Sequence, residues 1–139
     1  MAVSEEVKKQ LIDYIMLQVF DDQYIDRKEE KKILEEGIKK GMGVEEGLSI
    51  IRQVASEKNF VLERDAEDRA KDVLEAFANN DGKVDKKEFE NAVSVFKTHS
   101  KGKIPEHELK KRLKQMMETN GWKAKEGGLF GSKWYSAIS

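Results

Sequence analysis

Apolar residues recur along most of the chain at intervals of three and four positions, which is the spacing of one face of an α-helix. In the first run, Val7, Leu11, Ile15 and Val19 step by four, and Ser4 before them is a residue type that commonly caps helix N-termini. Further runs predict a helix from Asp26 to Gly41, one from Val44 to Lys58, one from Glu63 to Ala78, one after Asp85, and one from Pro105 to Asn120. The pattern therefore predicts an all-α fold: a bundle of about six helices made of helix–loop–helix units.

The apolar stripes of these helices are expected to form the core. Apolar residues at helical spacing could also line a binding groove, but ordinary core packing is the more common reason for them. The residues expected to point inward after the first helix are Ile33, Leu34, Ile38, Leu48, Ile51, Ala55, Ala66, Ala70, Val73, Leu74, Phe77, Phe89, Ala92, Val93, Phe96, Leu109, Leu113 and Met116.

Residues 122–139 have a different character and are expected to form a tail after a helical bundle domain of residues 1–121. Glycines interrupt this tail, and Ser132 could cap a final short helix in which Trp134 and Ile138 share a face. Large apolar side chains normally need cover from water, so the tail is expected to pack on the bundle or on a partner. The side chains concerned are Trp122, Leu129, Phe130, Trp134, Tyr135 and Ile138.

Composition excludes several classes of site. The chain has no cysteine, so disulfides, thiolate metal sites and cysteine nucleophiles are ruled out. No apolar run approaches the roughly 20 residues of a membrane span, and the polar start of the chain lacks a secretory signal, so a cytoplasmic location is expected. Residues 1–80 are net acidic and residues 81–139 net basic. The two segments could attract each other or an anionic partner, or simply form a solvated surface.

A repeated segment is the strongest internal signal. The stretch Asp22–Glu29 and the stretch Asp81–Glu88 share the pattern Asp, two variable residues, a β-branched apolar residue, Asp, two basic residues and Glu. A weaker third copy covers Gly102–Glu108. Each copy joins two predicted helices, which makes these segments candidate functional loops.

The pattern resembles the second half of an EF-hand calcium loop. In that register the oxygens of the second copy come from Asn79, Asp81, the carbonyl of Lys83, Asp85 and Glu88. Phe77 stands where an EF-hand has its first Asp, so at most about six oxygens are available, the low end of what Ca²⁺ takes. The first copy fits less well, because Gln18 and Phe20 fall at ligand positions and Gln23 replaces the glycine.

The same acids have a purely structural interpretation. Asp26 with Glu29, and Asp85 with Glu88, are three residues apart at a predicted helix start, which is the spacing of a capping box. The carboxylates would also suit the positive end of the helix dipole. This interpretation is the one we expect at both loops, with cation binding at residues 79–88 as the alternative.

The recurring segment is also similar to that of the bacterial tellurite-resistance TerB-like family, over about residues 5–100. That family is a helical bundle in which Asp-Gly-x-Ile/Val-x-x-x-Glu recurs between helix pairs, matching Asp81–Glu88 here and, less well, Asp22–Glu29. The resemblance implies a bacterial intracellular module for protein interaction or stress response, with a link to metals. The aromatic tail lies outside that pattern.

Catalytic chemistry is not expected. The histidines, His99 and His107, lie in a lysine-rich stretch, and no glycine-rich phosphate loop or nucleophile–base pair is apparent. The basic residues of 97–114, followed by aromatic residues, could suit single-stranded nucleic acid or an anionic membrane, but a solvated helix face is the expected explanation and nucleic acid an unlikely partner.

Two functional hypotheses remain. The first is a non-enzymatic intracellular protein-interaction module in which the tail side chains named above clamp the protein's own groove or dock on a partner, another protein or a second copy. The second is a divalent-cation sensor that binds Ca²⁺ through Asn79, Asp81, Lys83, Asp85 and Glu88; the first hypothesis requires no cofactor.

Overall fold

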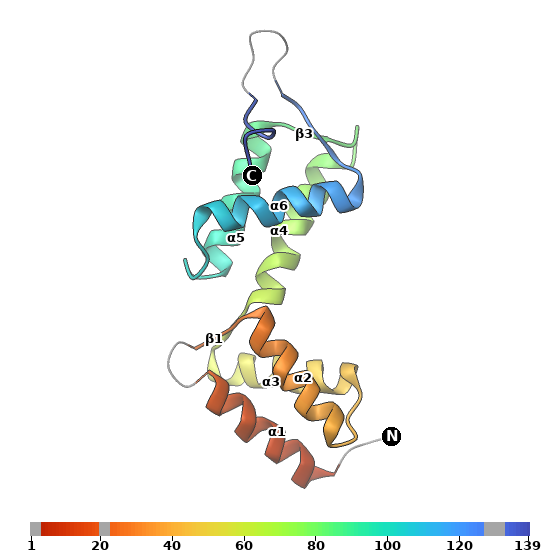
Figure 1. Cartoon of the computed structure of the whole chain (residues 1–139), viewed down its shortest axis with the longest axis vertical. Helices are drawn as coiled ribbons and strands as arrows, with labels where there is room; N and C mark the ends of the chain where they lie inside the picture. Colours follow the sequence, from red (N-terminus) through yellow and green to blue (C-terminus); the bar gives the residue numbers. More distant parts are fainter. Residues whose placement is uncertain (1–3, 20–22, 127–132) are drawn as a thin grey trace. The chain divides into compact units, whose positions relative to one another are not determined.

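The computed structural model describes residues 4–19, 23–126 and 133–139, which form six α-helices and four two-residue strands (Figure 1). The predicted all-α class is confirmed. Contacts divide the chain into two compact units, Met1–Arg64 and Asp65–Ser139. Each unit has its own cluster of buried apolar side chains. The described tail residues fall within the second unit, and the domain boundary expected after residue 121 stays a prediction.

The first unit contains α1 (Glu5–Gln18), β1 (Tyr24–Ile25), α2 (Arg27–Lys39), α3 (Val44–Lys58) and β2 (Val61–Leu62). The strands are parallel, with Tyr24 opposite Val61 and Ile25 opposite Leu62. Helices α1, α2 and α3 all contact one another. Their buried cluster consists of Leu11, Ile15, Val19, Ile25, Ile33, Met42, Ile50, Ile51, Val54, Ala55 and Leu62.

The second unit begins near the start of α4 (Glu63–Ala78) and continues through β3 (Lys83–Val84), α5 (Lys86–His99), α6 (Glu106–Asn120) and β4 (Lys123–Ala124). Its strands are again parallel, with Lys83 opposite Lys123 and Val84 opposite Ala124. Its buried cluster consists of Ala66, Ala70, Leu74, Ala78, Val84, Phe89, Ala92, Val93, Phe96, Ile104, Leu109, Leu113 and Met117. Trp122, Trp134, Tyr135 and Ile138 pack against this cluster while remaining partly exposed.

The two units have the same order of elements, helix–strand–helix–helix–strand. The correspondence extends to single backbone bonds. The N–H of Val61 donates to the carbonyl of Gln23 at 2.9 Å, and the N–H of Lys123 donates to the carbonyl of Gly82 at 2.8 Å. The repeated segment seen in the sequence is therefore one part of a larger structural repeat.

Local sequence explains where the helices begin. Ser4 caps α1 by accepting from the N–H of Val7, as predicted. Asp26 and Asp85 cap α2 and α5, and each is the first residue of a complete capping box. These caps satisfy backbone donors that the first turn of a helix leaves without a partner.

The structure corrects some details of the predicted core. Ile38 is 53% exposed, and Met117 rather than Met116 is the buried methionine of α6. A step of four from Leu113 leads to Met117, so the inward face of α6 follows that spacing at its end. The third predicted loop, Gly102–Glu108, forms the connection into α6, where Ile104 is buried and no strand is present.

Candidate functional site

The predicted calcium loop lies between α4 and α5. Asn79 and Lys83 are exposed, and Asp85 and Glu88 are half-buried at the start of α5. The N–H of Glu88 donates to Asp85 Oδ1 at 2.8 Å, and the N–H of Asp85 donates to Glu88 Oε1 at 2.9 Å. The predicted capping box is therefore confirmed, and it occupies one oxygen of each carboxylate.

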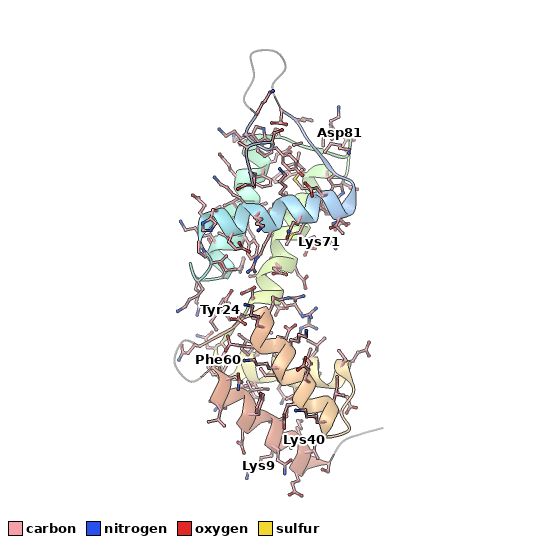
Figure 2. The ribbon with its side chains drawn as sticks, in the orientation of Figure 1. Lys9, Tyr24, Lys40, Phe60, Lys71 and Asp81 are labelled. Atoms are coloured by element: carbon pink, nitrogen blue, oxygen red, sulfur yellow. The ribbon has the colours of Figure 1, made fainter. Side chains whose placement is uncertain are left out.

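Asp81, which Figure 2 labels, lies in the same loop and has two partners of its own. The N–H of Lys83 donates to Asp81 Oδ1 at 3.0 Å, and Lys125 Nζ, just after β4, lies 3.1 Å from Asp81 Oδ2. The N–H of Lys83, followed by the ammonium of Lys125, lowers the pKa of Asp81 below its ordinary value. The hydrogen bond to Asp81 in turn raises the pKa of Lys125, and the negative charges of Glu88 and Asp85 add to this effect.

A lysine ammonium therefore supplies positive charge where the calcium interpretation would place a cation. Among the residues that the structure describes, no group of three or more His, Asp or Glu side chains is arranged to hold a metal ion. The first loop repeats the cap, because the N–H of Glu29 donates to Asp26 Oδ1 at 2.7 Å and that of Asp26 donates to Glu29 Oε1 at 3.2 Å. At both loops the Asp and Glu of the capping box hold a helix start.

The predicted aromatic residues of the tail meet on α5. The rings of Phe89 and Trp134 are 5.1 Å apart between centroids, and those of Trp134 and Tyr135 are 5.7 Å apart and nearly perpendicular. Tyr135 also makes an edge contact with Phe89, at 6.4 Å. Such aromatic pairs contribute about 0.5–1.5 kcal/mol each beyond the area they bury. Leu129 and Phe130, the other two predicted tail contacts, lie outside the described residues.

Polar contacts fix the end of the tail on α6 and after β4. Lys114 Nζ donates to the carbonyls of Ile138 at 2.8 Å and Tyr135 at 3.2 Å, and lies 4.8 Å from the centre of the Tyr135 ring. Glu126 accepts from the hydroxyl of Ser136 at 2.6 Å and from its N–H at 3.3 Å. The indole N–H of Trp134 donates to the carbonyl of Lys125 at 3.1 Å. We name residues 133–139 the docked segment, and the surface of α5 and α6 beneath it the docking face.

Two titrating groups at this contact, Glu126 and Tyr135 of the docked segment, have shifted pKa values. The hydroxyl of Ser136 lowers the pKa of Glu126 below its ordinary value. Burial raises the pKa of Tyr135, and the negative charges of Glu118 and Glu126 raise it further. Both shifts favour the protonation states that the two groups have near neutral pH.

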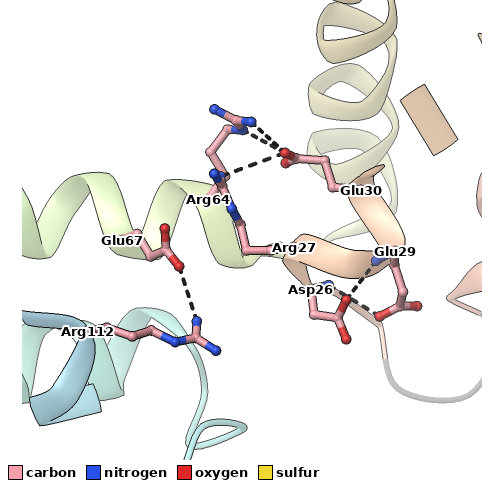
Figure 3. Close-up of polar contacts among 7 residues, drawn as sticks. All are labelled: Asp26, Arg27, Glu29, Glu30, Arg64, Glu67 and Arg112. Carbon is pink, nitrogen blue, oxygen red and sulfur yellow. Dashed lines mark hydrogen bonds and ion pairs between the residues drawn. The ribbon is translucent and has the colours of Figure 1, made fainter. Parts of the chain in front are cut away.

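The first unit has a polar arrangement at the corresponding place (Figure 3). Glu30 follows the capping-box glutamate of α2 as Phe89 follows that of α5. Glu30 is 4% exposed, and Arg64 donates to Glu30 Oε1 through Nε at 2.8 Å and through a terminal nitrogen at 2.7 Å. Nearby, the hydroxyl of Tyr24 donates to buried Glu63 at 2.7 Å. The two units thus differ in chemistry at the position where the tail docks in the second one.

Sequence reasoning named the tail aromatics but missed three residues that hold them. Lys114 was considered part of a solvated basic stretch, and neither Lys125 nor Glu126 stood out in any motif. A lysine that binds carbonyls looks the same in sequence as one on a solvated face. The pairing of β3 with β4, which brings Lys125 and Glu126 to this place, has no signature in two-residue strands.

Membrane helices and similarity to known proteins give two further findings. Within the described residues, no helix combines the length and apolar character needed to cross a membrane. The resemblance to TerB-like proteins stays a prediction. No family model, no curated protein sequence and no solved structure matches this chain.

Proposed function

We propose that the chain is a non-enzymatic protein-interaction module whose binding element is the docked segment. The observation that supports this proposal is the seating of residues 133–139 on α5 and α6 through both aromatic and polar contacts. Apolar anchors about one helical turn apart that pack on a helical surface are a recurrent mode of peptide recognition, and Trp134 and Ile138 have that spacing. The docking face is then a receptor, and the chain's own tail is its resident ligand.

The partner that we propose is a second copy of this chain. The segment that fits the docking face is the chain's own, so every other copy carries the same ligand. Exchange of an identical element between copies is a low-cost route to dimers.

The alternative function, sensing a divalent cation at residues 79–88, requires several of the observed contacts to break. A bound cation would compete with the helix N–H groups for Asp85 and Glu88 and with Lys125 for Asp81. The ammonium of Lys125 would also repel the cation at short range. These contacts favour the interaction module over the sensor.

Binding of the docked segment in trans tests the proposal. The receptor is the full-length Trp134→Ala variant, whose own tail has lost its largest contact with Phe89. A synthetic peptide of residues 133–139 is titrated into it, and binding is followed by calorimetry and by the fluorescence of the peptide tryptophan. We expect saturable one-to-one binding.

Two controls make the result specific. A peptide that carries Trp134→Ala should bind at least tenfold more weakly, since it lacks the ring that packs against Phe89. A receptor that also carries Phe89→Leu, which keeps an apolar core side chain but removes the ring, should bind more weakly while it keeps its helical circular dichroism. Equal binding of the two peptides, or no saturable binding to the helical Trp134→Ala receptor, would count against the proposal.

A further inference from the structure

The docked segment is a single turn of chain. Two charged side chains from outside the segment contact it at different places. Within the turn, the N–H of Ala137 donates to the carbonyl of Lys133, and that of Ile138 donates to the carbonyl of Tyr135, each at 3.0 Å. Trp134, Tyr135 and Ile138 are half-buried, whereas Ser136 and Ala137 are exposed. The backbone conformation of the segment is therefore part of what the docking face contacts.

Lys114 contacts the carbonyl side of this turn. Its ammonium reaches two carbonyl oxygens, those of Tyr135 and Ile138, and one aromatic face. Hydrogen bonds from a charged donor are stronger than those between neutral groups. An extended peptide would not bring two carbonyls that are three residues apart to one ammonium, so this contact depends on the turn.

Glu126 contacts hydrogen-bond donors of the turn, whereas Lys114 contacts its acceptors. Its two carboxylate oxygens accept from the N–H and the hydroxyl of Ser136. Glu126 and Lys114 both belong to the second unit but lie on different elements, one just after β4 and the other in α6. Glu126 thus accepts from a backbone N–H of the turn, and Lys114 donates to backbone carbonyls of the turn.

We infer that Lys114 and Glu126 act as a two-point charge clamp that determines which segments the docking face accepts. The clamp selects one turn of chain with the sequence Trp-Tyr-Ser-x-Ile, in which Trp134, Tyr135 and Ile138 supply apolar contacts and Ser136 supplies the hydroxyl for Glu126. The residue at position 137 is unrestricted apart from proline, which lacks the N–H that closes the turn. The trans form of this inference depends on the proposed function, whereas the clamp on the chain's own tail does not.

The first experiment uses full-length protein and measures the docked segment in cis. Amide hydrogen exchange at Ala137 and Ile138 reports whether the turn is closed and docked. Lys114→Met keeps an apolar stem of similar length and removes the ammonium. Lys110→Met is the matched control, since Lys110 lies one turn earlier in α6, beside Trp134 and Ile138, and no described hydrogen bond joins it to the segment.

We expect Lys114→Met to speed exchange at both amides by about tenfold or more, which is the effect of losing one charge-assisted hydrogen bond. Glu126→Gln should speed it by a smaller factor, and Lys110→Met should leave it within about twofold. Amides in the middle of α5 report global folding and should exchange as in the unmodified protein. Equal exchange in the Lys114→Met and Lys110→Met variants would overturn the clamp, since Lys114 would then contribute only its stem.

The second experiment asks whether the clamp also selects ligands in trans. The peptide of residues 133–139 is titrated into full-length receptors that combine Trp134→Ala with either Lys114→Met or Lys110→Met. We expect roughly tenfold weaker binding to the Lys114→Met receptor only, and a comparable loss for a peptide with Ala137→Pro. If the peptide binds both receptors equally, the trans form of the clamp fails and the interaction module stands. If it binds neither receptor but exchange in cis follows the clamp, the interaction module fails and the clamp stands.

Discussion

Glu30 and Phe89 occupy the same position in the two units, yet one is a buried carboxylate bound by Arg64 and the other is the base of an aromatic cluster. Each residue follows directly on the glutamate of a capping box. The two units therefore share a backbone arrangement at this position but place a charged side chain in one and an aromatic side chain in the other. In the first unit, Arg64, two residues beyond β2, binds Glu30. In the second unit, Trp134 of the docked segment packs against Phe89.

Removal of Arg64 should show how costly the buried carboxylate is without that partner. We expect Arg64→Met to lower the free energy of unfolding by up to about 3 kcal/mol, because Glu30 then keeps only the longer contact with Arg27, at 3.7 Å, as compensation for its buried charge. The double variant Glu30→Leu/Arg64→Met should lose much less, since apolar replacement of both partners is often near neutral. Urea unfolding of the unmodified protein, Arg64→Met, Glu30→Leu and the double variant closes this cycle and measures the coupling. Equal losses in the single and double variants would contradict the assigned role.

Loss of Trp134 should weaken the second unit through its contact with Phe89. For Trp134→Ala we expect a decrease of about 1–3 kcal/mol in the free energy of unfolding, since the ring is only half-buried. Trp134→Phe should recover part of the loss because it retains an aromatic contact. Thermal and urea unfolding provide the measurement. An unchanged stability in Trp134→Ala would mean that the segment does not cover Phe89 in solution.

The capping boxes make a prediction about calcium. Asp26→Ala and Asp85→Ala should each destabilise the protein by about 1 kcal/mol, the usual effect of removing a helix N-cap. The loss should be the same with EDTA and with millimolar Ca²⁺, because both acids serve the helix. Calorimetric titration of the unmodified protein with Ca²⁺ should give no saturable heat. A saturable signal that Glu88→Gln abolishes would restore the cation sensor.

Backbone strain differs between the two loops. Gln23 and Gly82 precede corresponding strands, and both have positive φ, at 53° and 71°. Only glycine adopts this region without steric cost. Gly82→Ala should therefore lower the free energy of unfolding by about 1 kcal/mol, although no atom stands within 4 Å of the added methyl. Gln23→Gly should be neutral or stabilising, and a large loss in that variant would contradict the comparison.

Docking of the segment should depend on pH at both ends of the accessible range. The pKa of Glu126 is lowered from 4.5 by the Ser136 hydroxyl, so its contribution is present above pH 4.5 and lost as pH falls through the shifted value. The pKa of Tyr135 is raised from 10.0 by burial, so its contribution is present below pH 10.0 and lost as pH rises further. Amide chemical shifts of Ala137 and Ile138 measure the docking. Glu126→Gln should abolish the acid limb, and an unchanged acid limb in that variant would assign the effect to other groups.

The sequence predicted the parts of this fold that depend on local pattern. Six helices and both capping boxes follow from apolar periodicity and from Asp and Glu at fixed spacing, and the structure confirms them. The tail was expected to pack on the bundle or on a partner, and its described aromatic residues lie against the core of the second unit. Such local patterns predict helices well because a helix forms its backbone hydrogen bonds within one short segment of chain.

The non-local features could not be predicted in the same way. The strand pairs are two residues long, so they lack the alternating pattern that marks a strand. The repeat of whole units is not visible in the sequence, because corresponding residues differ in type. Asn59 and Gly121 both end a helix in the left-handed conformation, and the N–H groups of Phe60 and Trp122 both donate to a carbonyl five residues earlier. The roles of Lys114 and Glu126 arise only when distant segments meet.

The central claim is that the docking face binds the aromatic segment of its own chain at low concentration and that of a second copy as concentration rises, and one nuclear Overhauser measurement tests it most directly. Isotope-labelled and unlabelled full-length protein are mixed, and contacts between the Phe89 ring and the Trp134 indole are recorded with and without isotope filtering. The account predicts the contact within one chain at low concentration and a filtered, intermolecular contact between the same two rings as concentration rises. Absence of any contact between Phe89 and Trp134, or an intramolecular contact that never exchanges between copies, would contradict it.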